Sequence, residues 1–154
     1  MSEEEFWNRV SSVNAGMLDA TDGMRSVPMS HHPDQAAKVL WFITAQGTDL
    51  VESVTDGPRD ATYIVSDAAK GIYADLHGTL ELSQDKAKLE ELWSTVADAW
   101  FEGGKDDPDI RLLRLNIDAG EVWITPTSGI TFMLGIARAQ LMGTSPDMGS
   151  HFTL

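Results

Sequence analysis

The sequence has no cysteine among its 154 residues. This absence excludes thiolate nucleophiles, CxxC redox motifs, iron–sulfur clusters and zinc–thiolate sites. It also fits a reducing compartment. A chain of this length suits one domain, which buries roughly two-thirds of its unfolded surface and therefore needs no disulfide or structural metal to fold.

Positive charge is scarce as well, because 11 Lys and Arg residues stand against 24 Asp and Glu residues, for a formal net charge of −13. Such a field repels nucleic-acid phosphates and anionic lipid headgroups, so neither partner is expected. No apolar run approaches the roughly 18 residues that suggest a membrane-spanning helix. The first five residues lack the basic start and apolar run of a secretory signal. We therefore expect a soluble, cytoplasmic protein.

Common catalytic and phosphate-binding motifs are also missing. The sequence has no GxGxxG after a predicted strand, no GxxxxGK[ST] loop and no GxSxG elbow. Its histidines are His31, His32, His77 and His151. Adjacent His31 and His32 point to opposite faces of a strand, so we expect polar positions at the rim of the fold for them rather than a shared metal ion. Residues 106–109 lack the spacing of an EF-hand loop and are interpreted as a solvated turn, so no metal site is predicted.

Hydrophobic periodicity predicts a mainly β chain with a few helices. The expected strands are 15–20, 24–32, 39–44, 61–66, 71–82, 110–117 and 121–125. The expected helices are 3–14, a short one between Gly47 and the turn at 56–58, 84–101, and 130–142. Hairpin signals dominate and no βαβ rhythm is present, which favours an antiparallel barrel with peripheral helices.

Several local signals sharpen these boundaries. Asp22-Gly23 indicates a hairpin turn, and Pro28 in the return strand indicates an edge position or a bulge. Thr48 is the expected N-cap of the short helix, and Ser83 is the expected N-cap of the helix over 84–101. Gly78 marks a candidate bulge, and residues 118–120 are interpreted as a turn between two strands.

Five groups of residues, taken in order, resemble those of a known family. They are 25–29 (Arg-Ser-Val-Pro-Met), 40–44 followed by Gly47-Thr48, 70–73 followed by 78–82, 89–93 followed by Trp100-Phe101, Gly103 and Asp107-Pro108, and 112–114 followed by 121–123. Their order and spacing, over about residues 6–125, resemble the general stress protein group of the pyridoxamine-phosphate-oxidase-like superfamily of FMN-binding split barrels. Together the motifs are specific for fold and family, and much less so for activity.

The resemblance implies an α+β fold that is mainly β, namely a six-stranded, antiparallel, Greek-key-like split barrel with peripheral helices. It also implies a homodimer with two flavin sites at its interface, each holding the small-molecule ligand FMN or a relative such as FAD or deazaflavin. The chain then divides into a split-barrel domain, 1–128, and a helical extension, 129–154. We expect the apolar face of the extension to pack on the same domain or on the dimer partner.

The positions that contact flavin in the family are occupied here by Arg25, Ser26, Val27, Pro28, Met29, Ile43, Thr44, Thr48, Asp49, Leu50 and Trp123. The resemblance implies that Arg25 contacts the phosphate and that 26–29 line the isoalloxazine. It assigns Ile43, Thr44 and Thr48 to the ring and phosphate, and Trp123 to the ring. A guanidinium and a helix N-terminus both suit a phosphate. Purely structural roles stay open: an ion pair for Arg25, a helix cap for Thr48, and core packing for Trp123.

Asp49 and Leu50 depart from the family pattern, because relatives place a lysine two residues after the position of Thr48, often with another basic residue nearby. A phosphate donor is lost, and a carboxylate stands near where the phosphate would lie, which weakens binding in a partly desolvated site. Lys38 or Arg59 could compensate.

Three functions remain open from the sequence. The first is an FMN-dependent oxidoreductase acting on a small substrate in the stress response, in which the cofactor performs the electron or hydride transfer. The second is a non-catalytic protein that stores or senses a flavin, and the third is a dimeric scaffold that has lost its cofactor. No acid/base group stands out as catalytic. Pyridoxamine-phosphate oxidase activity itself is disfavoured, since no basic cluster for a substrate phosphate can be located.

Overall fold

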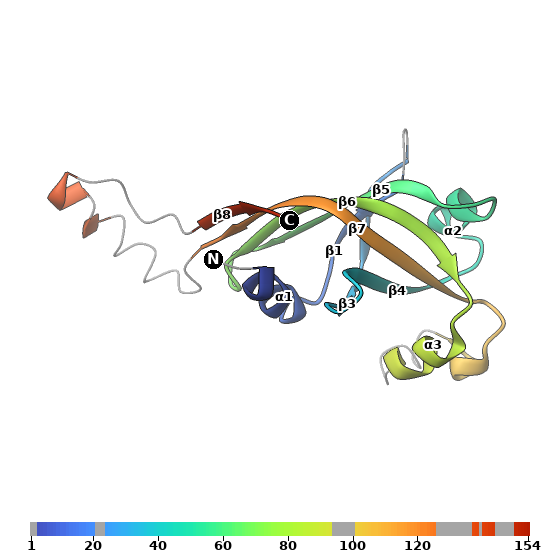
Figure 1. Cartoon of the computed structure of the whole chain (residues 1–154). Helices are drawn as coiled ribbons and strands as arrows, with labels where there is room; N and C mark the ends of the chain where they lie inside the picture. The colour runs from blue at the N-terminus through green and yellow to red at the C-terminus, as the bar shows by residue number, and fades with distance from the viewer. Residues whose placement is uncertain (1–2, 21–23, 94–100, 126–136, 139, 144–149) are drawn as a thin grey trace.

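The computed structural model describes residues 3–20, 24–93, 101–125, 137–138, 140–143 and 150–154. In chain order its elements are α1 (Glu3–Ser11), β1 (Gly16–Asp19), β2 (Val27–Met29), β3 (His32–Asp34), β4 (Val39–Ala45), α2 (Asp49–Val54), β5 (Arg59–Asp67), β6 (Ile72–Ser83), α3 (Lys86–Leu92), the 3-10 turn η1 (Gly104–Asp106), β7 (Ile110–Ile124) and β8 (Ser150–Thr153). Figure 1 shows a curved sheet with α1 beneath the arch of β6 and β7, and with α2 and α3 toward one end.

The strands in the described part of the chain form one antiparallel sheet. Its neighbours follow the order β2-β1-β5-β6-β7-β4-β3, and β8 pairs with β7. The sheet curls around a shared interior, because Phe42 of β4 and Tyr63 of β5 make an edge-to-face ring contact at 5.1 Å although β6 and β7 separate their strands. The predicted split-barrel class is confirmed, with eight strands in the sheet rather than six.

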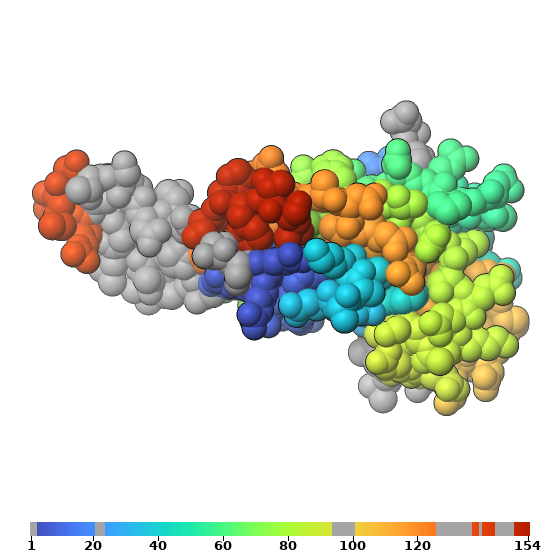
Figure 2. All heavy atoms as spheres, in the orientation of Figure 1, coloured from blue at the N-terminus to red at the C-terminus, as the bar shows by residue number. Residues whose placement is uncertain are grey.

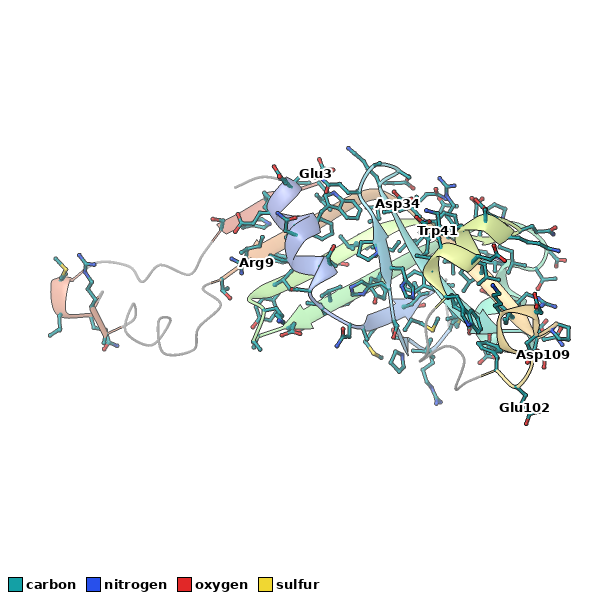
Figure 3. The ribbon with its side chains drawn as sticks, turned by 90° about the horizontal axis from the view of Figure 1, so that it is seen from below. Glu3, Arg9, Asp34, Trp41, Glu102 and Asp109 are labelled. Carbon is teal, nitrogen blue, oxygen red and sulfur yellow. The ribbon has the colours of Figure 1, made fainter. Side chains whose placement is uncertain are left out.

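The interior is apolar and is closed by α1. Phe6, Trp7 and Val10 form the buried stripe of this helix, as their helical spacing predicts. Arg9 fastens the helix from its other side, because Nη1 donates to the carbonyls of Thr125 at 2.9 Å and Gly71 at 3.2 Å (Figure 3). The rest of the main cluster comes from the inward faces of the strands and from Leu50 and Val54 of α2.

A smaller cluster lies on the outward face of the sheet, under α3. Val39, Trp41 and Leu112 are buried there, with Leu89 and Leu92 of α3 packed against them. Trp41 is only 3% exposed, and the cations of Lys88 and Arg114 lie 5.6 and 5.3 Å from its ring centroid. Asp34 accepts from Trp41 Nε1 at 3.4 Å, and Figure 3 shows the two side by side.

A bulge in β7 replaces the turn that we expected at 118–120. Opposite His77 and Gly78 of β6 stand Ala119 and Ile117, so Asp118 is the extra residue. The expectation was wrong because Asp-Ala-Gly suits a bulge as well as a turn. Gly78 marks the other side of the bulge as predicted, and a Cβ there would lie 1.9 Å from the carbonyl oxygen of Asn116.

Three other expectations differ from the structure. The second long helix begins after the N-cap Asp85 rather than Ser83, and α3 ends at Leu92, while 94–100 lie outside the described residues. His32–Asp34 pairs with β4 as a short strand where a turn was expected at 33–35. Residues 150–153 form β8 although the tail carried no strand signal. Most of the expected helix 130–142 lies outside the described residues.

In the described part of the chain, no helix has the length and apolarity to cross a membrane.

Candidate functional site

One end of the sheet gathers most of the predicted flavin-contacting residues. The β1–β2 hairpin, the end of β4 and the start of β5 meet there, because Asp19 pairs with Thr62 and Val27 with Leu18. The short helix α2 leads directly into β5. Met24 and Val27 pack against the cluster that contains Leu50 of α2. The strand register thus brings Arg25, Ser26, Thr44 and Thr48 to the same end of the molecule.

Arg25 is an exposed cation at this end, just before β2. Its guanidinium has no hydrogen bond or ion pair with any described residue, so the alternative of a structural ion pair gains no support. Ser26 Oγ lies 3.5 Å from Asp19 Oδ2. Val27 and Met29 face the core, whereas Pro28 faces outward on the edge strand of the sheet path, as predicted for a proline.

The start of α2 is built by Thr48, which is the N-cap as predicted. Its Oγ1 accepts from Val51 N at 3.4 Å and donates to the carbonyl of Ala45 at 3.1 Å. Asp49 is exposed in the first turn, whereas Leu50 is 3% exposed and belongs to the core. Leu50 therefore contributes a core side chain at the position where the family resemblance implies a basic residue.

The predicted β4 residues do not act together. Thr44 is two residues after the inward-facing Phe42 and so lies on the same face of β4. Ile43 lies on the outward face and packs with the cluster under α3. The structure therefore places Ile43 on the opposite face of the sheet from Thr44.

Of the two compensating cations, Lys38 does not lie beside Thr48. Lys38 precedes β4 and pairs with Glu3 at 3.4 Å, and the whole length of β4, roughly 20 Å, separates it from Thr48. Arg59, by contrast, opens β5 shortly after α2 and is exposed, and its guanidinium has no ion pair or hydrogen bond with a described residue. Arg111, which the sequence analysis did not single out, pairs across the sheet with Thr44. Its guanidinium is engaged, because Nη2 donates to Gln46 Oε1 at 2.7 Å and Nη1 donates to two backbone carbonyls.

The outward face beside Arg25 carries an apolar row. Pro28 of β2, Met17 of β1 and Ile64 of β5 are consecutive partners across three strands. Met17 is 41% and Ile64 is 40% exposed, and together with Pro28 they form a contiguous apolar patch on the surface. Within the described residues, no helix of this chain covers the row, so these side chains stay available to a ligand or a partner.

Trp123 lies far from Arg25 within one chain. Four strand-to-strand steps separate β7 from β2, or roughly 19 Å along the sheet. Trp123 is half exposed on the outward face, and the His151 ring stacks on it with centroids 4.9 Å apart and planes 10° apart. His151 Nε2 also lies 3.3 Å from Glu121 Oε2. Figure 2 shows β8, in red, beside β7, in orange, with which it pairs. The core alternative for Trp123 is not what the structure shows.

A polar row that we did not predict runs beside the apolar one. Asp19, Thr62 and His77 are consecutive cross-strand partners on β1, β5 and β6. Thr62 Oγ1 lies 3.2 Å from His77 Nδ1, and Asp75 Oδ1 lies 3.1 Å from His77 Nε2. No local sequence signal marks this row, because it forms only when the strand register is known.

His31 is buried rather than placed at the rim, which corrects our expectation for it. It is 5% exposed, with Nε2 2.8 Å from the carbonyl oxygen of Val10 and Nδ1 2.6 Å from the Tyr63 hydroxyl. Burial lowers the pKa of His31, against the opposing effect of the Val10 carbonyl, and burial also raises the pKa of Tyr63. These groups link α1 to β5 inside the barrel, away from the outward face.

The residues at this end suit the ring of a flavin better than its phosphate. Met17 and Ile64 offer apolar surface, and Asp19 Oδ1 is a buried acceptor without a hydrogen-bond partner among the described residues. An unsatisfied acceptor beside an open apolar surface fits a ligand that carries N–H or O–H groups. For the phosphate, Arg25 and Arg59 are exposed cations with no ion pair to a described residue, and Asp49 opposes them. The outward face thus fits a flavin, with an incomplete anion anchor.

Comparisons with known proteins agree with the geometry. A family model described as pyridoxamine 5'-phosphate oxidase like matches residues 2–147. The structure of a general stress protein 26 from Jannaschia sp. CCS1 is similar, with 48% identity and a TM-score of 0.91 over 97% of this chain and 94% of that chain.

Two further structures are similar at lower identity. The general stress FMN/FAD binding protein of Xanthomonas citri shares 29% identity, with a TM-score of 0.72 over 82% of this chain and 90% of that chain. The FAD binding protein of Mycobacterium smegmatis shares 20% identity, with a TM-score of 0.51 over 79% of this chain and 95% of that chain, a likeness of fold alone. A search of curated proteins gives no match.

Proposed function

Because this chain belongs to the pyridoxamine 5'-phosphate oxidase-like family, we propose that it is a flavin-binding protein of the general stress type. The observation that carries the proposal is the free Arg25 guanidinium beside the open row of Pro28, Met17 and Ile64. A guanidinium binds a phosphate through charge-assisted hydrogen bonds, and an apolar row covers one face of a planar ring. The similar Xanthomonas citri protein is named for FMN/FAD binding.

We also propose that the protein acts as a homodimer with two flavin sites at its interface. Arg25 and Trp123 lie roughly 19 Å apart along the sheet of one chain. A site that uses both would take the arginine from one subunit and the tryptophan from the other. The exposed apolar side chains of the outward face would then be covered in the dimer, which accounts for their exposure in a single chain.

A bound flavin would supply hydride or electron transfer, and this chain would bind and orient it. The described residues of the outward face would exclude water from one side of the ring through Met17 and Ile64. Arg25 would hold the phosphate, and Thr48 would stay the cap of α2. On this proposal the activity is that of a flavin-dependent oxidoreductase with a small substrate, in the cytoplasm.

The test is flavin binding by the purified full-length protein. We expect FMN to be retained after desalting and to bind in a fluorescence titration, and Arg25→Ala to weaken FMN by roughly 10- to 100-fold, as loss of a charge-assisted contact implies. Arg138→Ala removes the same charge from the described helical residues 137–138 and should leave binding unchanged. Equal affinities in wild type and Arg25→Ala would remove Arg25 from the site.

Asp49 favours one rival, the dimeric scaffold that has lost its cofactor. Its exposed carboxylate stands at the start of α2, where the family resemblance places phosphate contacts. Comparison of FMN with riboflavin, which lacks the phosphate, separates the readings. Binding of neither would support the scaffold. Retained flavin that NADH or NADPH cannot reduce would support a binding or sensing protein rather than an oxidoreductase.

A further inference from the structure

Asp19, Thr62 and His77 form a row of hydrogen-bonding side chains on the outward face of the sheet. Holding the strands together does not require all three. Thr62 Oγ1 lies 3.2 Å from His77 Nδ1, and Asp75 Oδ1 lies 3.1 Å from Nε2. Asp75 Oδ1 has no aligned hydrogen bond, so its contact with the ring is electrostatic. A carboxylate beside Nε2 favours the proton on that nitrogen, which leaves Nδ1 as an acceptor for the Thr62 hydroxyl.

A bulge between β6 and β7 lies directly beside this row. His77 is the last regular partner of β7 before the extra residue Asp118. Gly78, which follows, must lack a side chain because its backbone lies against the carbonyl of Asn116. Bulges are common beside functional sites, where they change the direction of a side chain. This bulge lies beside the exposed imidazole of His77.

Asp19 extends the row toward the free arginine. It is the cross-strand partner of Thr62, and its Oδ2 lies 3.5 Å from the hydroxyl of Ser26, the neighbour of Arg25. Its Oδ1 is buried and has no hydrogen-bond partner among the described residues. A buried, unpaired carboxylate oxygen costs free energy unless a ligand satisfies it.

The apolar row lies two residues along each strand from the polar row. Met17 and Ile64 are cross-strand partners, and so are Asp19 and Thr62. Along each strand the two rows are therefore roughly 7 Å apart, the length of two residues. A flat ring resting on Met17 and Ile64 would therefore present its edge to Asp19, Thr62 and His77. The edge would meet a carboxylate acceptor, a hydroxyl and an imidazole, which together suit a ring with both N–H and C=O groups.

We propose that Asp19, Thr62 and His77 form the hydrogen-bonding edge of a site for a planar heteroaromatic ring that lies on Met17 and Ile64. The inference rests on the proposed function, in which that ring is the isoalloxazine. It goes further by making ring recognition independent of the phosphate anchor. The chain then tolerates Asp49 and Leu50 at the phosphate end because the ring end supplies affinity of its own.

The experiment follows the imidazole signals of the full-length protein by NMR while FMN or riboflavin is added. The chain has only four histidines, so the signals can be assigned with single variants. We expect both ligands to shift the His77 signals, and His77→Gln and Thr62→Val each to weaken both ligands by about tenfold, the value of one hydrogen bond. Thr79→Val, on the same strand and face as His77, should leave both affinities unchanged.

The outcomes separate this inference from the function on which it rests. FMN binding without any His77 shift or any loss in the two variants would overturn the polar edge and leave flavin binding intact. Riboflavin binding with a His77 shift, but no FMN binding, would support the edge and overturn FMN as the ligand. Binding of neither would overturn both. Far-UV circular dichroism of the variants, which change only exposed or half-exposed outward positions, checks that the fold is kept.

Discussion

The outward face of the sheet has two halves that its own chain treats differently. The half formed by β4 and the first part of β7 is covered by α3, and Trp41 is buried there near the cations of Lys88 and Arg114. The half formed by β2, β1, β5 and β6 has no helix over it in the described residues, and its Met17 and Ile64 are about 40% exposed. Figures 1 and 2 show α3 confined to one end.

Both halves carry large apolar side chains on outward positions, so residue type does not distinguish them. The covered half differs in having a polar contact that holds its helix against the sheet. Asp34 accepts from Trp41 Nε1 and lies 3.5 Å from Lys88 Nζ, which ties α3 to β3 and β4. The other half offers hydrogen-bonding groups that this chain leaves partly unused. We infer that the half under α3 stabilises the fold and that the uncovered half binds a ligand and a partner.

The comparison predicts very different costs for the two outward tryptophans. Trp41→Ala should lower the free energy of unfolding by about 3–5 kcal/mol, because it empties a packed site beneath α3. Trp123→Ala should cost about 1 kcal/mol or less, since the side chain is half exposed, while it weakens flavin binding. Urea unfolding measures both. Similar losses for the two variants would show that the halves are not distinct.

Acid should loosen the covered half in particular. Burial alone would raise the pKa of Asp34, but hydrogen bonds from Ala37 N and Trp41 and the charge of Lys88 together hold it below its usual value. A lowered folded pKa means that the stabilisation is present above about pH 3.8, the ordinary value, and is lost as pH falls through the folded pKa.

The variant Asp34→Asn tests this sign. At pH 7 it should lower the free energy of unfolding by about 1 kcal/mol, and the difference from wild type should shrink toward zero in strong acid. Urea unfolding at a series of pH values gives the answer. A difference that stays constant with pH would mean that the carboxylate charge is not what holds α3.

The smallest effect on stability is expected in the open half. The double variant Met17→Thr, Ile64→Thr puts a β-branched residue, which suits a strand, at two exposed positions, so the free energy of unfolding of the monomer should change by no more than about 0.5 kcal/mol. Its mass by light scattering should shift toward the monomer, and riboflavin should bind more weakly. A stable dimer with unchanged binding would place partner and ligand elsewhere.

Much of the fold can be predicted from the sequence because its signals are local. The run 39–44, the cap at Thr48 and the glycine at the bulge each depend on neighbouring residues only. The expected second long helix is broken at Trp93, where the backbone is extended, although the apolar stripe from Leu89 continues past Leu92 in the sequence.

The candidate site is less predictable, because it depends on register between distant segments. Met17 meets Ile64, and Asp19 meets Thr62, across more than forty residues of sequence. Neither the apolar row nor the polar row exists until that pairing is known. The stack of His151 on Trp123 likewise needs β8 on β7, and no local pattern in the tail announces it. By contrast, the family resemblance named Arg25 and Thr48, which lie at the same end of the sheet.

The extra residue in β7, Asp118, determines which side chains after it face the solvent. Before Asp118, odd-numbered Leu113 and Leu115 face the interior, and after it even-numbered Val122 and Ile124 do. Removing that one residue would restore strict alternation and exchange the two faces over the rest of the strand. In genetic terms, a single codon determines whether Val122 or Trp123 is presented on the outside of the protein.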